Sequence, residues 1–175
     1  MNAQQEETAA VVDELIHICR DGQEGFRMAA EAIEDDQELK RLLSSFSLQR
    51  AKFAGELQSL LANLGYEVSP SPGSAAGTAH RGWLKLRSLL TLHDNHAILA
   101  ECERGEDAAR DAYMKAVAER LPEPLREAIE RQRQEVLAAH NTVRALRDST
   151  PSNSTLAAAG NAIRTRTGEA AAPAR

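Results

Sequence analysis

The sequence predicts an all-α protein built around an antiparallel four-helix bundle of the ferritin-like type. Four long segments carry apolar residues at steps of three or four, which is the spacing of an amphipathic helix. Short links join the first segment to the second and the third to the fourth, so each pair should form an antiparallel hairpin. A much longer stretch, residues 65–93, separates the two hairpins. Two hairpins joined by a long crossover have the connectivity of ferritin-like bundles.

The four helices are expected over Thr8–Glu34, Asp36–Leu64, Asp94–Arg120 and Glu123–Asp148. Asp94 is the expected N-cap of the third helix, because a short carboxylate can accept from the first free backbone N–H groups. In the second helix the inward positions are predicted to be Leu39, Leu43, Phe46, Arg50, Phe53, Leu57, Leu60 and Leu64. In the third helix they are predicted to be Ile98, Cys102, Gly105, Ala109, Ala112 and Ala116.

The crossover and the C-terminal end differ from the helices in composition. Within the crossover, Thr78–Thr91 fits a short helix that carries Trp83 on its apolar face. Residues 149–175 are rich in Ala, Ser, Thr and Pro and lack a periodic apolar face, so we expect a disordered tail. The predicted organisation is therefore one bundle domain over residues 1–148, followed by that tail.

Composition excludes several classes of function. Hydrophobic residues make up 42% of the chain, enough for a packed core, but charged residues reach 27% and the net charge is −5. A net negative chain is a poor partner for nucleic acid. No apolar run approaches the roughly 18 residues that a membrane span needs, and a cytoplasmic protein is the expectation. Cys19 and Cys102 lie on opposite hairpins, and we expect two free, buried thiols without a disulfide.

Several segments resemble a known family. They are LIHICRDGQEGFRMAAE, QRAKFAGELQSLLANLG, HRGW, ILAECERGEDAARDAY and AAHNTVRALRD, which occur in this order from Val11 to Asp148. Together they are similar to an uncharacterised bacterial family of four-helix bundles that is placed in the ferritin-like superfamily and classed as a domain of unknown function. The resemblance implies the fold, but it implies no activity.

A di-metal carboxylate bundle needs a specific set of ligand residues, and this chain has only part of that set. Two of its helices each supply a Glu, and each of the other two supplies a Glu-x-x-His pair. Here the paired positions are Gln49 with Lys52 and Gln132 with Glu135. Glutamine does not neutralise a cation, and lysine repels one. We therefore expect no cofactor, and an iron or manganese site is the alternative. Its candidate ligands would be Glu24, Glu101, Glu106, Glu135 and His140.

A polar layer inside the bundle explains the same residues without a metal. Arg50 lies on an apolar stripe, and an unpaired buried charge is very costly. Glu24, Glu101 or Glu106 could neutralise it from the first and third helices. The predicted layer comprises Gln49, Arg50, Glu101, Glu106 and Gln132.

No catalytic residues are assigned, and we expect a non-catalytic bundle that acts through contacts with an unidentified protein partner. A homodimer is the candidate assembly. The alternative function is a di-metal oxidoreductase or metal-binding protein with a degenerate site.

Overall fold

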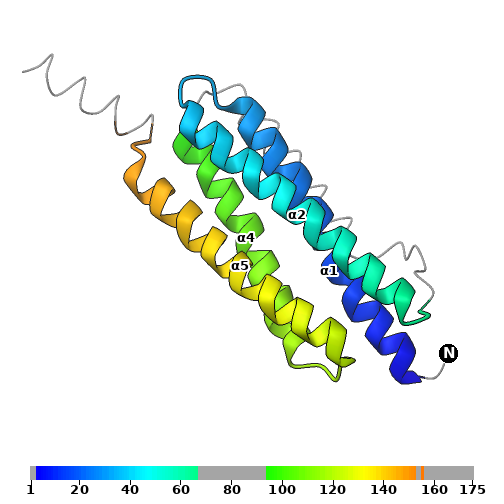
Figure 1. The fold of residues 1–175 in the computed structure, drawn as a ribbon. Helices are drawn as coiled ribbons and strands as arrows, with labels where there is room; N and C mark the ends of the chain where they lie inside the picture. Colours follow the sequence, from blue (N-terminus) through cyan, green and yellow to red (C-terminus); the bar gives the residue numbers. More distant parts are fainter. Residues whose placement is uncertain (1–2, 67–93, 153–154, 156–175) are drawn as a thin grey trace, which may run out of the picture.

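The computed structural model describes residues 3–66, 94–152 and 155, and the part of the chain that it describes is all-helical (Figure 1). The helices are α1 (Ala3–Ala32), α2 (Gln37–Asn63), α4 (Asn95–Val117) and α5 (Glu123–Ser149). α1 packs beside α2, and α4 beside α5. α1 also contacts α4, and α2 contacts α5 less closely. No strand occurs within these ranges, so the prediction of an all-α bundle is confirmed.

The starts of two helices follow from side-chain caps. Asp36 Oδ1 accepts from the backbone N–H of Leu39 at 2.8 Å, and Asp94 Oδ1 accepts from Ala97 at 3.1 Å. Each bond satisfies a donor that has no partner inside the helix. The prediction that Asp94 caps a helix is therefore confirmed.

Gly65 terminates α2 because it adopts a backbone conformation that other residues avoid. Its φ is +74°, in the left-handed region. The N–H of Gly65 donates to the carbonyl of Ala62 at 3.0 Å, and that of Tyr66 donates to Leu61 at 3.1 Å. These two bonds form a Schellman motif, which satisfies the last carbonyls of the helix. The chain must therefore leave the helix axis at Gly65.

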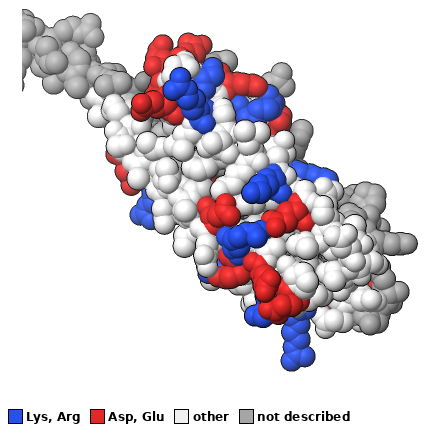
Figure 2. All heavy atoms as spheres, in the orientation of Figure 1, with Lys and Arg blue, Asp and Glu red and all other residues white. Residues whose placement is uncertain are grey.

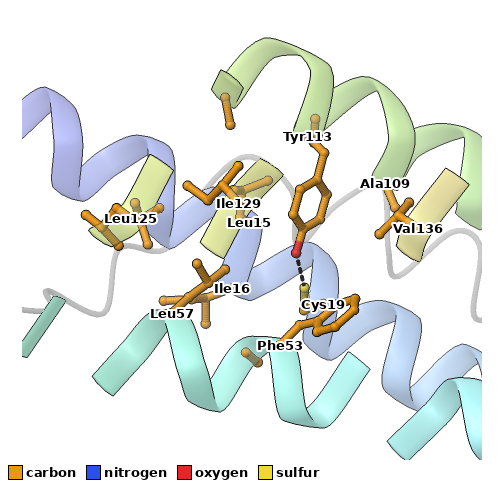
Figure 3. Packing of buried hydrophobic residues seen from close by; sticks show 14 of the residues in the cluster. Leu15, Ile16, Cys19, Phe53, Leu57, Ala109, Tyr113, Leu125, Ile129 and Val136 are labelled. Atoms are coloured by element: carbon orange, nitrogen blue, oxygen red, sulfur yellow. Dashed lines mark hydrogen bonds between the residues drawn. The ribbon is translucent and has the colours of Figure 1, made fainter. Parts of the chain in front are cut away.

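The core consists of two clusters, one towards each end of the bundle, and every described helix contributes to both. The first contains Leu15 and Ile16 of α1, Leu57 and Leu61 of α2, Tyr113 of α4, and Leu125 and Ile129 of α5. Figure 3 shows part of this packing. The second contains Phe26 of α1 and Ile33 just beyond its end, Leu39 and Leu43 of α2, Ile98 and Leu99 of α4, and Val143 of α5.

Two details of the predicted stripes were wrong. In α2 the buried residue near the C-terminus is Leu61, whereas Leu60 is half-buried and Leu64 is 38% exposed. In α4 Gly105 is exposed and Glu106 is buried. Steps of three and four both fit a helix of 3.6 residues per turn, so periodicity alone could not choose between neighbouring positions. The choice at Glu106 matters most, because it places a carboxylate in the core.

Two predicted elements fall on other parts of the chain. The short helix over Thr78–Thr91, with Trp83, lies outside the described residues. So does most of the predicted tail, residues 149–175. α5 itself ends at Ser149, one residue beyond the predicted end of the bundle.

Candidate polar site in the bundle core

Arg50 of α2 points into the bundle, where only 1% of its surface is exposed. Its Nη2 lies 2.5 Å from Glu106 Oε2, and the Glu106 side chain is 2% exposed. Glu106 belongs to α4, so the pair joins α2 to α4. An arginine keeps its charge at any accessible pH, and its burial therefore requires an anion at this distance.

Aromatic rings and a glycine enclose the guanidinium. Its Cζ lies 5.8 Å from the ring centre of Phe26 and 5.5 Å from that of Phe53, within the range of cation–π attraction. A Cβ on Gly22 of α1 would lie 3.4 Å from Arg50 Cγ. Gly22 therefore lets the arginine stem run close against the α1 backbone.

Gln49 connects Arg50 to α5. Arg50 Nη1 donates to Gln49 Oε1 at 2.6 Å, and Gln49 Nε2 donates to Glu135 Oε2 at 3.0 Å. A guanidinium only donates and a carboxylate only accepts, so this pair of contacts fixes the orientation of the amide. Gln49 thus links the buried guanidinium of Arg50 to the half-buried carboxylate of Glu135.

Tyr113, a second glutamine and a cysteine form a separate buried chain, part of which Figure 3 shows. Gln132 Nε2 donates to Glu56 Oε2 at 2.8 Å, which leaves Gln132 Oε1 to accept from the Tyr113 hydroxyl at 2.6 Å. The Tyr113 oxygen also lies 3.2 Å from Cys19 Sγ. Because the single hydroxyl proton is used on Gln132, the thiol must be the donor in this last contact. This chain links residues of all four described helices.

Burial sets the protonation of the core groups. It raises the pKa of Glu106, while the Arg50 guanidinium opposes the shift by favouring the carboxylate. Burial raises the pKa of Cys19 to about 11 and that of Cys102 to about 12. Both thiols are therefore protonated at neutral pH and poor nucleophiles. The two cysteines are free and buried, as predicted.

The other two acids considered for Arg50 lie elsewhere. Glu24 Oε1 forms an ion pair with Arg27 Nη2 at 2.6 Å, on a half-exposed part of α1. Glu101 pairs with Arg104, one turn along α4. Of Glu24, Glu101 and Glu106, the structure brings only Glu106 into hydrogen-bond contact with Arg50. The contact follows from Glu106, rather than Gly105, facing inward.

The remaining candidate metal ligands are also engaged by protein groups. His140 Nε2 lies 2.9 Å from Asp107 Oδ1, and Glu135 accepts from Gln49. Within residues 3–66, 94–152 and 155, no three His, Cys, Asp or Glu side chains gather in a way that could hold a metal ion. Glu106, the candidate ligand deepest in the core, neutralises an arginine.

Sequence reasoning missed Tyr113 and Glu56. Tyr113 continues the buried series of Ala109 and Ala116 at steps of four and three, so the helical period could have identified it. Glu56 is half-buried between α2 and α5, and it also binds Arg131 Nη2 at 2.6 Å. Nothing in its spacing distinguishes it from a surface glutamate.

Charged side chains of both signs lie next to one another on the face that carries α2 and α5, and uncharged surface separates the groups (Figure 2). That face therefore shows no continuous basic surface of the kind that binds nucleic acid. Among the helices that the structure describes, none is both long and apolar enough to cross a membrane.

The fold and the site define a class: an all-helical bundle whose core contains an ion pair and a hydrogen-bonded polar chain. Residues 7–119 match a family described as a domain of unknown function, DUF2383. The chain belongs to that family. The comparison with curated proteins gives no match. The family match includes Arg50 and Glu106 but ends before α5, which supplies Gln132, Glu135 and His140.

Proposed function

We propose that this protein is a non-catalytic bundle of the ferritin-like type that acts through contacts with other proteins. The shared ends of the helices support an antiparallel arrangement. Gln4, at the start of α1, donates to the carbonyl of Arg120, just beyond the end of α4, at 3.3 Å. Leu57 and Leu61, late in α2, pack in the same cluster as Leu125, early in α5. A long crossover between parallel α2 and α4 follows from these directions.

The Arg50–Glu106 pair is the observation that carries the proposal. A di-metal centre would need this carboxylate, and Arg50 both engages it and repels a cation. Burial raises the pKa of both thiols, so each is held in its protonated, poorly nucleophilic form. The polar groups of the core thus support a structural role. A cytoplasmic location and a homodimeric assembly remain predictions.

Metal analysis of the purified protein distinguishes this proposal from the di-metal alternative. We expect protein purified without added chelator to contain far less than one iron or manganese per chain, because Glu106 is neutralised from within the fold. Elemental analysis by mass spectrometry against protein concentration gives the ratio. The same preparation dialysed against chelator is the control. Stoichiometric iron or manganese that survives buffer exchange would favour the di-metal function instead.

A further inference from the structure

α2 and α5 meet along a seam that polar side chains bridge. Among the described helices, they are the neighbouring pair in least close contact. Gln49 of α2 donates to Glu135 of α5 at 3.0 Å. Glu56 of α2 accepts from Arg131 at 2.6 Å and from Gln132 at 2.8 Å. The side chains of Arg131 and Glu56 are 54% and 31% exposed, so water already competes for their ion pair.

The polar groups at the seam continue into the core. Gln49 also accepts from Arg50 Nη1 at 2.6 Å, and Arg50 forms its buried ion pair with Glu106. Gln132 accepts from the buried hydroxyl of Tyr113. A buried ion pair has lost hydration that its own attraction only partly replaces, so admitting water returns much of that loss. Parting two apolar surfaces has no such compensation. The α2–α5 seam is therefore where separating two helices should cost least.

We propose that the bundle opens locally at the α2–α5 seam, while α1 keeps its contacts with α2 and α4, and that this opening admits water to the polar layer and to Cys19. Glu56, at the seam, is the first member of the buried chain that ends at Cys19. In the closed bundle Cys19 is fully buried, and burial raises the pKa of its thiol to about 11. The thiol should therefore react only when the seam is open. The inference does not depend on whether the protein acts through protein contacts.

Thiol alkylation of the full-length chain tests the opening directly. Iodoacetamide is the probe, and mass spectrometry of the digested protein measures Cys19 separately from Cys102. A local opening exposes little surface, so we expect the rate at Cys19 to be nearly independent of urea well below the unfolding midpoint. It should rise steeply only where the whole chain unfolds. A rate at Cys19 that follows global unfolding at every urea concentration would overturn the proposal.

Arg131 and Arg126 provide a matched pair of variants on α5. Arg131 pairs with Glu56 across the seam, whereas Arg126 pairs with Glu123 of its own helix, and the two arginine side chains are 54% and 56% exposed. Arg131→Ala should raise the rate of Cys19 alkylation without urea by about two- to fivefold, the effect expected from losing an exposed ion pair. Arg126→Ala should leave the rate unchanged. Equal rates in the two variants would contradict opening at this seam.

A like charge at the seam should act more strongly. Arg131→Glu places a third carboxylate beside Glu56 and Glu135. We expect Cys19 to be alkylated faster in this variant than in Arg131→Ala, and the difference should shrink in about 1 M salt, where charges are screened within about 3 Å. A rate in Arg131→Glu no higher than that of the wild type would also contradict the proposal.

Discussion

Replacing Arg50 with alanine should lower the free energy of unfolding by about 3–5 kcal/mol. The substitution leaves Glu106 as an unpaired carboxylate that is 2% exposed, and removes a cation held between Phe26 and Phe53. Glu106→Gln should cost a similar amount, because the guanidinium then lacks its anion. Urea unfolding followed by circular dichroism and by size-exclusion chromatography measures both effects.

Removing both charges together is the informative control. In the double variant Arg50→Met, Glu106→Leu, most of the lost stability should return, since neither charge remains buried alone. Arg27→Ala breaks an exposed ion pair with Glu24 on α1 and should change stability little. An Arg50→Ala protein as stable as its parent would show that the guanidinium is not buried as described.

The second-largest effect is expected from Tyr113→Phe, which removes one oxygen atom from the core. Gln132 Oε1 would lose its donor, and the Cys19 thiol would lose its acceptor. An unsatisfied buried polar group costs about 1–3 kcal/mol, so the free energy of unfolding should fall by that amount. Urea unfolding at neutral pH measures the change.

Tyr66→Phe is the matched control, because Tyr66 is the other tyrosine of the chain and is half-buried at the edge of the same cluster. It should change stability little. Combining Tyr113→Phe with Gln132→Met should cost less than the sum of the two single changes, since no amide oxygen is then left unsatisfied. Strict additivity would mean that the hydroxyl and the amide do not interact.

The sequence was sufficient for the helices and for the choice of Arg50 as a core residue. Helical period and connection lengths are local properties, and they predicted all four described helices to within a few residues at most ends. The largest difference is at the start of α1, which begins at Ala3 instead of Thr8. There the helix includes the polar segment AQQEE, which has no periodic apolar residues from which a helix could be predicted.

The partners inside the core could not be chosen from the sequence. Glu24, Glu101 and Glu106 all lie near the stripes of their helices, and the choice among them depends on how far each helix is rotated and at what height it packs. A rotation of one residue, about 100°, exchanges Gly105 for Glu106. The Tyr113–Gln132–Glu56 chain could not be predicted for the same reason. It joins three helices, and no pattern within any one of them indicates it.

His96 shows how ligand-like spacing can serve a structural role. His93 and His96 are spaced as a metal-binding pair would be, but His93 lies outside the described residues. His96 Nδ1 lies 3.1 Å from the carbonyl of Arg147 and 2.8 Å from that of Thr150. The imidazole therefore binds carbonyls at the C-terminal end of α5, where the last four carbonyls lack intrahelical partners.

Metal-dependent stability tests the central claim, that the core acids serve the fold instead of a metal. A ligand that binds only the folded state adds about 4.1 kcal/mol to the free energy of unfolding when its free concentration is about 1,000 times its dissociation constant. Urea unfolding of the wild-type chain should be measured with and without excess Mn²⁺, and anaerobically with Fe²⁺. We expect no gain in stability with either metal, because Arg50 already neutralises Glu106. A gain of several kcal/mol that Glu106→Gln abolishes would show that the core acids bind a metal.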